Sequence, residues 1–175
     1  MTSCAVFNYD PNRQLSDLLK SDYEKADGEF ANYPTTVKKR IERELSGTNY
    51  GPLTLWSELT GESQYKDSIA RLKDQRVNLN FISNRRAVAK LFYQGEMIKE
   101  KKLKGRIKHG YFYYRGSFIV IPFFPVIYKR DHYRYRLGLN TSNSLVIDNA
   151  WNYWIFALFA GDYSKGQISA EFIRE

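Results

Sequence analysis

The clearest pattern in the chain is the alternation of apolar and polar positions from about residue 76 onward. Val77, Leu79 and Phe81 alternate with polar neighbours, and apolar residues recur at every second position between Ala87 and Tyr93. A period of two is typical of β-strands, because successive side chains of a strand point to opposite faces of the sheet. The pattern therefore predicts consecutive strands in this part of the chain.

Short polar or glycine-containing segments divide the C-terminal sequence further. They predict turns at Ser83-Asn84, Gln94-Gly95, His109-Gly110 and Asn140 to Asn143, and a bend or bulge at Arg115-Gly116. About eight short strands result, and no helix-length crossover separates them. This pattern is typical of an antiparallel meander, sandwich or small barrel, and we expect a barrel-like meander whose closure the sequence leaves open.

The stretch from Tyr111 to Tyr128 is the most apolar and most aromatic of the chain. Pro122 and Pro125 interrupt it, which excludes a long helix or a membrane-spanning helix. We expect its strands to be buried. The segment from Trp151 to Ala160 is apolar on both faces, and we expect the barrel interior to cover one face and helices to cover the other.

The first half of the chain has a different spacing, which is typical of helices. Leu15, Leu18 and Leu19 follow an i, i+3, i+4 pattern, and Val37, Ile41 and Leu45 are four residues apart. The predicted fold is therefore α+β, with N-terminal helices packed on the barrel-like meander. Its parts are a flexible tether at 1–13, a helical lead-in at 14–75 and the sheet or barrel at 76–175, and residues 14–175 form one domain.

The charge of the chain is concentrated in the predicted sheet. The formal net charge is +8, and the segment from Glu96 to Arg136 alone holds 11 Lys and Arg against three acidic residues. Such a segment predicts either a binding site for an anionic partner or a solvated face whose lysines protect a sheet edge. The candidate ligand-binding residues on this basic face are Lys102, Lys104, Arg106, Lys108, Arg134 and Arg136.

Aromatic residues lie close to these cations in the sequence. The candidate aromatic patch consists of Tyr111, Tyr113, Trp151 and Trp154. Aromatic rings beside basic residues are typical of proteins that stack on nucleic acid bases, so a nucleic-acid-binding β module is the alternative function. Known RNA-binding signatures are absent from the sequence, and the same rings also suit a β core.

The sequence offers no recognisable catalytic machinery. The motifs of serine hydrolases, P-loop proteins, dinucleotide-binding proteins and zinc proteases do not occur. We expect His109 and His132 at solvated positions, and Asp131 and Asp148 at peripheral ones. One cysteine, Cys4, allows neither an internal disulfide nor a cysteine-based zinc site. We therefore predict a protein that is not an enzyme and has no cofactor or metal.

The first four residues, Met1-Thr2-Ser3-Cys4, resemble the lipobox of bacterial lipoproteins, with Met1 where that motif usually has leucine. The resemblance implies that Cys4 carries a lipid. With its β-rich body, the chain is similar in general style to small lipoproteins of Bacteroidota-type bacteria. The body is lipocalin-like in architecture only, because the Gly-x-Trp signature of lipocalins is absent.

These observations lead to one predicted function and one alternative. We expect a non-catalytic cell-envelope lipoprotein, periplasmic or at the outer membrane and anchored through Cys4. It would bind an anionic lipid or polysaccharide, or an envelope protein, through its basic face. The alternative is a cytoplasmic nucleic-acid-binding module. The sequence leaves the ligand, the oligomeric state and the strand order open.

Overall fold

The computed structural model describes residues 7, 15–16, 23–43, 52–64, 66–123, 127–158 and 160–175. In chain order, its elements are β1 (Leu15–Ser16), the 3-10 helix η1 (Tyr23–Ala26), β2 (Gly28–Ala31), β3 (Thr36–Arg43), α1 (Leu55–Thr60), α2 (Ile69–Asp74), β4 (Gln75–Ser83), β5 (Arg86–Tyr93), β6 (Glu96–Lys104), β7 (Arg106–Lys108), β8 (Tyr111–Phe123), β9 (Ile127–Asn140), β10 (Leu145–Ala157) and β11 (Ala160–Phe172). Every described strand pair is antiparallel, as the sequence predicts.

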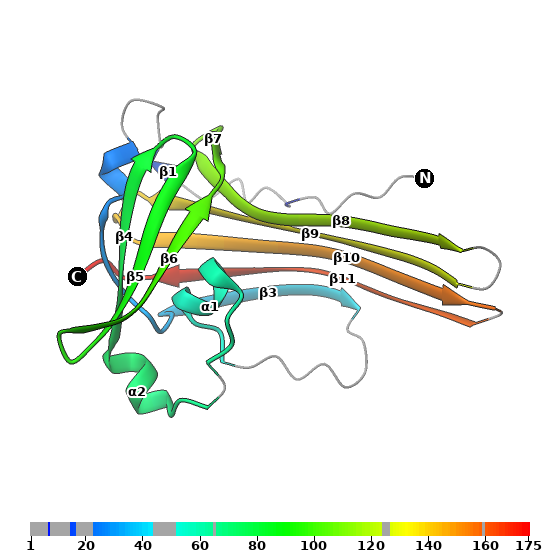
Figure 1. Cartoon of the computed structure of the whole chain (residues 1–175), viewed down its shortest axis with the longest axis horizontal. Coiled ribbons are helices and arrows are strands. Elements are labelled where there is room, and N and C mark those ends of the chain that lie inside the picture. The colour runs from blue at the N-terminus through cyan, green and yellow to red at the C-terminus, as the bar shows by residue number, and fades with distance from the viewer. Residues whose placement is uncertain are drawn as a thin grey trace.

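The strands form two sheets of very different size. The long sheet has the order β3-β11-β10-β9-β8-β7, with β1 beside the end of β9, and the small sheet has the order β2-β4-β5-β6. The small sheet crosses one end of the long sheet, and β8 to β11 project well beyond it (Figure 1). The predicted barrel is wrong: among the described strands, the two outer strands of the long sheet do not pair with each other.

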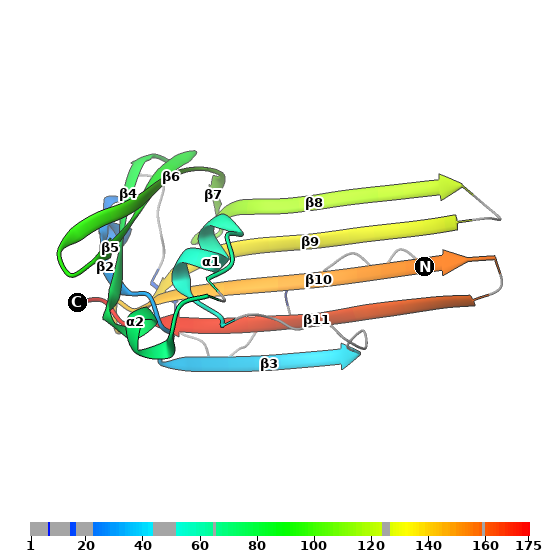
Figure 2. The same cartoon turned by 60° about the horizontal axis from the view of Figure 1, so that its bottom comes forward.

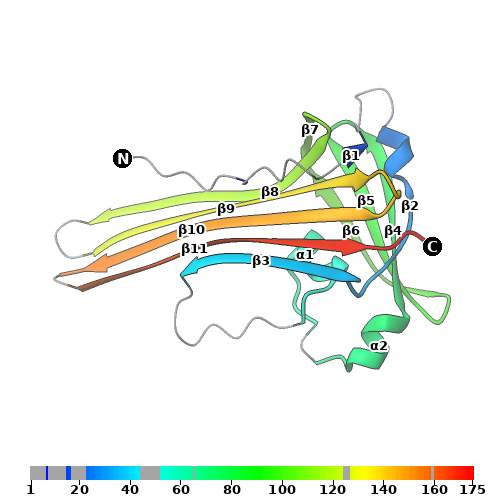
Figure 3. The same ribbon diagram turned by 180° about the vertical axis from the view of Figure 1, so that it is seen from behind.

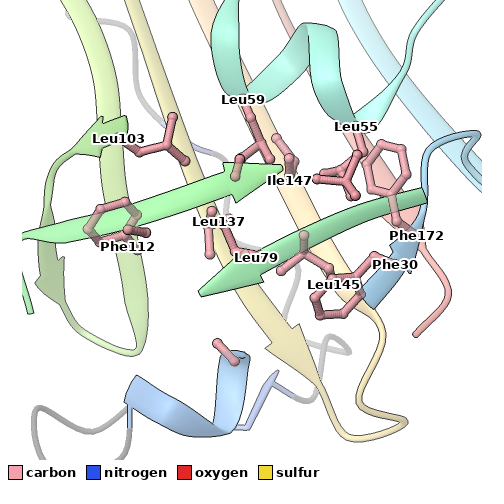
Figure 4. Close-up of a cluster of buried hydrophobic side chains, with 14 of the residues drawn as sticks. Phe30, Leu55, Leu59, Leu79, Leu103, Phe112, Leu137, Leu145, Ile147 and Phe172 are labelled. Carbon is pink, nitrogen blue, oxygen red and sulfur yellow. The ribbon is translucent and has the colours of Figure 1, made fainter. Parts of the chain in front are cut away.

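The hydrophobic core fills the space between the two sheets at the end where they overlap. The inward-facing residues of β4, Val77, Leu79 and Phe81, are at most 3% exposed. Across from them lie Leu137 of β9 and Ile147 of β10, and α1 closes one side of the cluster (Figure 4). Burial of these apolar side chains is the main source of stability at this end of the molecule.

Helix α1 is short, and local signals fix both of its ends. Thr54 is the N-cap and forms a capping box with Ser57, while Gly61 ends the helix with a φ of 77°. Only glycine adopts that left-handed conformation without strain. The helix is held between its caps so that Leu55 and Leu59 point into the core.

The predicted N-terminal helices are wrong. The described part of 14–46 contains β1, η1, β2 and β3, and the side chains of Leu18, Leu19 and Leu45 lie outside the described residues. In β3, Val37 pairs with Ala170 and Ile41 with Gly166. A spacing of four residues is a multiple of two, so it places side chains on one face of a strand as well as on one face of a helix.

The predicted strands after residue 75 and their turns are confirmed. The turns at Gln94-Gly95 and His109-Gly110 have positive φ angles at both residues. A register shift between Tyr113 and Arg115 marks the predicted bulge near Arg115-Gly116. Backbone conformation at these points follows from short-range sequence, which explains why they are predictable.

Burial falls steadily along each long strand. In β10, the residues from Leu145 to Asp148 are buried, whereas Phe156 and Ala157 at the other end are exposed. Beyond α1, no described helix or second sheet covers the distal halves of β8 to β11 (Figure 2), and the view from behind shows the same projection (Figure 3). Among the residues that the structure describes, the distal part of the long sheet is therefore a single layer.

Candidate functional site

The end of this single layer exposes large apolar side chains. Three consecutive residues of β8, Ile119, Val120 and Ile121, are 46%, 37% and 44% exposed. The expectation that the stretch from Tyr111 to Tyr128 is buried is confirmed at Tyr111 and Phe112 and is wrong at Ile119 to Ile121, because the strands extend past the small sheet that would cover them. We call the exposed apolar set the sheet tip; it consists of Ile119, Val120, Ile121, Trp154, Phe156 and Leu158.

The sheet tip is apolar on both faces. Ile121 pairs with Lys129, which pairs with Ile155, so these three residues form one row across the strands. We call such a row of paired residues a level; the next level holds Val120, Arg130 and Trp154. Adjacent levels of a sheet point to opposite faces, so Ile121 and Val120 are exposed on different sides. A single flat partner would cover only one of them.

Charged and aromatic side chains lie at the same levels as the tip. Lys129 lies 5.5 Å from the centre of the Tyr153 ring on one face, and Trp154 stacks on Tyr163 at 5.2 Å on the other. Lys129 and Arg130 are neighbours in β9, so they place one cation on each face. Asp131 and Asp162 lie at nearby levels.

The face of the long sheet that points away from the core carries most of its exposed cations. Through the strand register, Arg106 shares a level with Arg136, Asp148 and Lys38, and the level of Arg134 extends to Arg40 on β3. We call the exposed cations of this surface the outer basic face; they are Lys38, Arg40, Arg106, Lys108 and Arg134.

The structure separates the six predicted basic residues. Lys102 and Lys104 lie on β6 in the small sheet, while Arg106, Lys108, Arg134 and Arg136 lie in the long sheet. Sequence proximity placed them on one face, but the chain changes sheets between β6 and β7. The cations of β3 were missed, because the sequence pattern assigned them to a helix.

Arg136 is buried and is unavailable to a ligand. Its Nε donates a hydrogen bond of 2.9 Å to Asp148, which is fully buried, and its guanidinium lies 3.9 Å from the ring of Tyr111 and 4.0 Å from that of Phe7. The expected peripheral position of Asp148 is therefore wrong. The expected solvated position of His132 is also wrong: it is 5% exposed, and its Nε2 accepts a hydrogen bond from Arg134.

The predicted aromatic residues do not form one patch. Trp151 points to the core-side face and donates a hydrogen bond from Nε1 to Ser164. Tyr111, Tyr113 and Trp154 share the outer face, but Tyr113 is level with Asp148, six residues along β10 from Trp154. At about 3.4 Å per residue, that separation is roughly 20 Å. Of the four, Trp154 belongs to the sheet tip.

A polar cluster lies where α1 meets the long sheet. Burial raises the pKa of the Glu58 carboxyl to about 7, against a smaller opposing effect of Arg115. Burial, followed by the charge of Glu58, raises the pKa of the Tyr135 hydroxyl to about 12. The guanidinium of Arg115 lies 4.8 Å from the Tyr135 ring, and the Tyr114 hydroxyl donates to the main-chain carbonyl of Glu58 at 3.2 Å.

This cluster makes stability depend on pH. A carboxyl whose pKa is raised on folding stabilises the protein fully below its unfolded pKa, and this contribution is lost as pH rises through the folded pKa near 7. At pH 8 we expect the free energy of unfolding of Glu58→Gln to exceed that of the wild type by on the order of 2 kcal/mol, which would appear as a higher urea midpoint. At pH 4 we expect little difference. The exposed Glu100→Gln serves as the control, and an unchanged pH profile in Glu58→Gln would contradict the assignment.

The described residues contain a cavity with a polar and charged lining, but no group of side chains suited to a metal ion. A cavity of about 490 Å³ lies beside α2, and its described lining includes neither histidine nor cysteine. Its acidic residue, Asp67, lies 3.6 Å from Arg71. The described chain has no cluster of three or more His, Cys, Asp or Glu suited to a metal ion.

Comparison with protein-family models, curated proteins and solved structures finds no match to this chain. None of the described helices has the length and apolar character needed to cross a membrane. Cys4, the predicted lipidation site, lies outside the described residues. Function must therefore be inferred from the geometry of the sheet tip and the outer basic face.

Proposed function

We propose that this protein is a non-catalytic, membrane-docking protein of the cell envelope. The sheet tip enters the headgroup region of an anionic bilayer, and the outer basic face supplies electrostatic attraction to the membrane surface. The observation that carries the proposal is the exposure of Ile121 and Val120 on opposite faces at adjacent levels. A bilayer surrounds an inserted tip and covers both faces at once, which one flat protein surface does not.

The side chains around the tip suit this depth. Trp and Tyr favour the boundary between headgroups and acyl chains, and Trp154 and Tyr163 stack there on one face. The long side chains of Lys129 and Arg130 reach back from an apolar level to place their charges among phosphates. The apolar part spans only a few levels, about 10 Å, which fits interfacial insertion and not a crossing of the bilayer.

A lipid on Cys4 would complement the tip. We propose that this lipid supplies one attachment to the membrane and that the sheet tip supplies a second, which would fix the orientation of the protein on the membrane. Envelope location remains part of this proposal, and it depends on the lipobox-like sequence from Met1 to Cys4.

The nucleic-acid alternative has less support from the geometry. Base stacking requires exposed rings beside the phosphate-binding cations. Tyr111, which pairs with Lys108, is 7% exposed and lies 3.9 Å from the guanidinium of Arg136, and Tyr113, which pairs with Arg106, is only partly exposed. The exposed rings, Trp154 and Phe156, lie at the apolar tip instead.

Vesicle binding tests the proposal. The protein without its lipid should bind vesicles that contain phosphatidylglycerol more tightly than purely zwitterionic ones, with a blue shift in fluorescence as Trp154 enters the headgroup region. Trp154→Ser/Phe156→Ser should weaken binding roughly 10-fold or more, because both side chains lose apolar burial. Binding that falls with salt would support the electrostatic contribution.

The small sheet offers a matched control. Met97 and Ile98 are adjacent, apolar and similarly exposed, at 53% and 42%, but they lie away from the tip. Met97→Ser/Ile98→Ser should bind vesicles like the wild type. Equal loss in both variants, or no vesicle binding by the wild type, would contradict the proposed function. Tighter binding to single-stranded RNA than to vesicles would favour the alternative.

A further inference from the structure

The outer edges of the two sheets differ sharply in charge. An exposed strand edge invites pairing with another chain, and charged side chains usually prevent this. The edge strand β6 carries Lys99, Lys101, Lys102 and Lys104, and β3 carries Lys38, Lys39 and Arg40. Residues 116–123 of β8 carry no charge at all. The edge of β8 therefore lacks the charged residues that protect the other two.

Within the part of the chain that the structure describes, this edge is also unpaired along most of its length. On its outer side, β7 pairs only with Tyr111 to Tyr113 of β8, and no other described strand pairs there. The main-chain N–H and C=O groups that point outward from residues 114–123 thus have no strand partner within the described chain. Pro122 lacks an N–H group, so it can contribute at most its carbonyl to any pairing along this edge.

We propose that β8 pairs with β8 of a second copy of this chain, antiparallel and about a two-fold axis. The free edge fits itself in this arrangement, because residue 115 of one copy lies opposite residue 123 of the other, Ile119 lies opposite Ile119 of the second copy, and each β7 ends the pairing. Antiparallel pairing places the two Arg115 side chains at opposite ends of the seam, whereas parallel pairing would bring them together. The two long sheets become one continuous sheet.

The dimer has a consequence for the sheet tip. In an antiparallel pair, the two tips point in opposite directions, so both cannot enter one flat bilayer. Ile119 and Ile121 also gain neighbours across the seam, which lowers their exposure to water. Self-association is therefore the state that we propose for the protein when no membrane is present. The inference is independent of membrane docking, since it concerns the free backbone edge.

Sedimentation velocity in lipid-free buffer tests the pairing. We expect concentration-dependent dimers of the wild type, and at least a 10-fold weaker dimer for Ile119→Lys/Ile121→Lys, which places four lysines along the seam. Met97→Lys/Ile98→Lys adds the same charge to β6 and should dimerise like the wild type. Trp154→Ser/Phe156→Ser, which leaves β8 unchanged, should also still dimerise, so this test separates the dimer from membrane docking.

Oxidative cross-linking provides a second measurement. In a Cys4→Ser background, Ile119→Cys lies near the middle of the seam and should form disulfide-linked dimers faster than Ile98→Cys on β6. A wild type that remains monomeric at roughly 0.1 mM, or a β8 lysine variant that dimerises as well as the wild type, would overturn the proposal. Faster cross-linking through β6 than through β8 would also overturn it.

Discussion

Replacing Asp148 by alanine is expected to lower the free energy of unfolding by about 3–5 kcal/mol, because Arg136 would remain as a buried charge without its partner. Asp148 is fully buried and lies 2.9 Å from the Nε of Arg136. The rings of Tyr111 and Phe7 on that guanidinium limit its access to water. Urea unfolding followed by tryptophan fluorescence would measure the loss.

A double variant separates the cost of an unpaired charge from the loss of packing. Arg136→Met/Asp148→Leu removes both charges and keeps apolar volume, so it should be more stable than Asp148→Ala. Asp148→Ala would then be the least stable of the three proteins, below both the wild type and the double variant. A loss of less than about 1 kcal/mol in Asp148→Ala would show that Arg136 finds water or another partner.

Asn32 is expected to be the second most sensitive polar position. Asn32→Ala should cost about 2–4 kcal/mol, because it leaves several buried groups without hydrogen-bond partners. The Nδ2 of Asn32 donates to Gln64 and Gln75 at 3.0 and 2.7 Å, and its Oδ1 accepts from the main chain of Trp56 at 2.8 Å. This residue thereby ties β2 to the start of α1 and of β4.

Asn80 provides a matched control for this prediction. It is an exposed asparagine of β4 that donates one hydrogen bond of 2.8 Å to Asp27. Asn80→Ala should cost less than about 1 kcal/mol, because water replaces the lost partner. Similar unfolding midpoints for Asn32→Ala and Asn80→Ala would show that the buried network contributes little.

The candidate site was only partly predictable. Trp154 is one of the four predicted aromatic residues, and Lys129 and Arg130 belong to the basic segment from Glu96 to Arg136. The exposure of Ile119 to Ile121 was missed, because consecutive apolar residues usually indicate burial on both faces. The sequence did contain one signal that could have identified the tip. In two pairs of consecutive strands, apolar residues lie both before and after the turn that connects the strands.

Burial of polar residues was the least predictable feature. His132 alternates with arginines and was expected to be solvated, and Asp148 follows a short apolar run and was expected to be peripheral. Which face of a sheet is covered depends on what packs against it, and neighbouring residues in the sequence carry little information about that. The positions of Arg136 and Asp148 follow instead from strand register and from the contact of Phe7 with that face.

The sequence by itself determined the strands after residue 75, their turns and their antiparallel pairing, because period-two patterns and turn residues act over a few neighbours. It led to the wrong prediction of a helix where β3 lies, since apolar residues four apart suit one face of a helix or of a strand. Only the tertiary structure decided that choice, through pairing of β3 with β11. It also decided that the sheets stay open and that β8 to β11 extend past their cover, because closure and overlap depend on contacts between residues far apart in the chain.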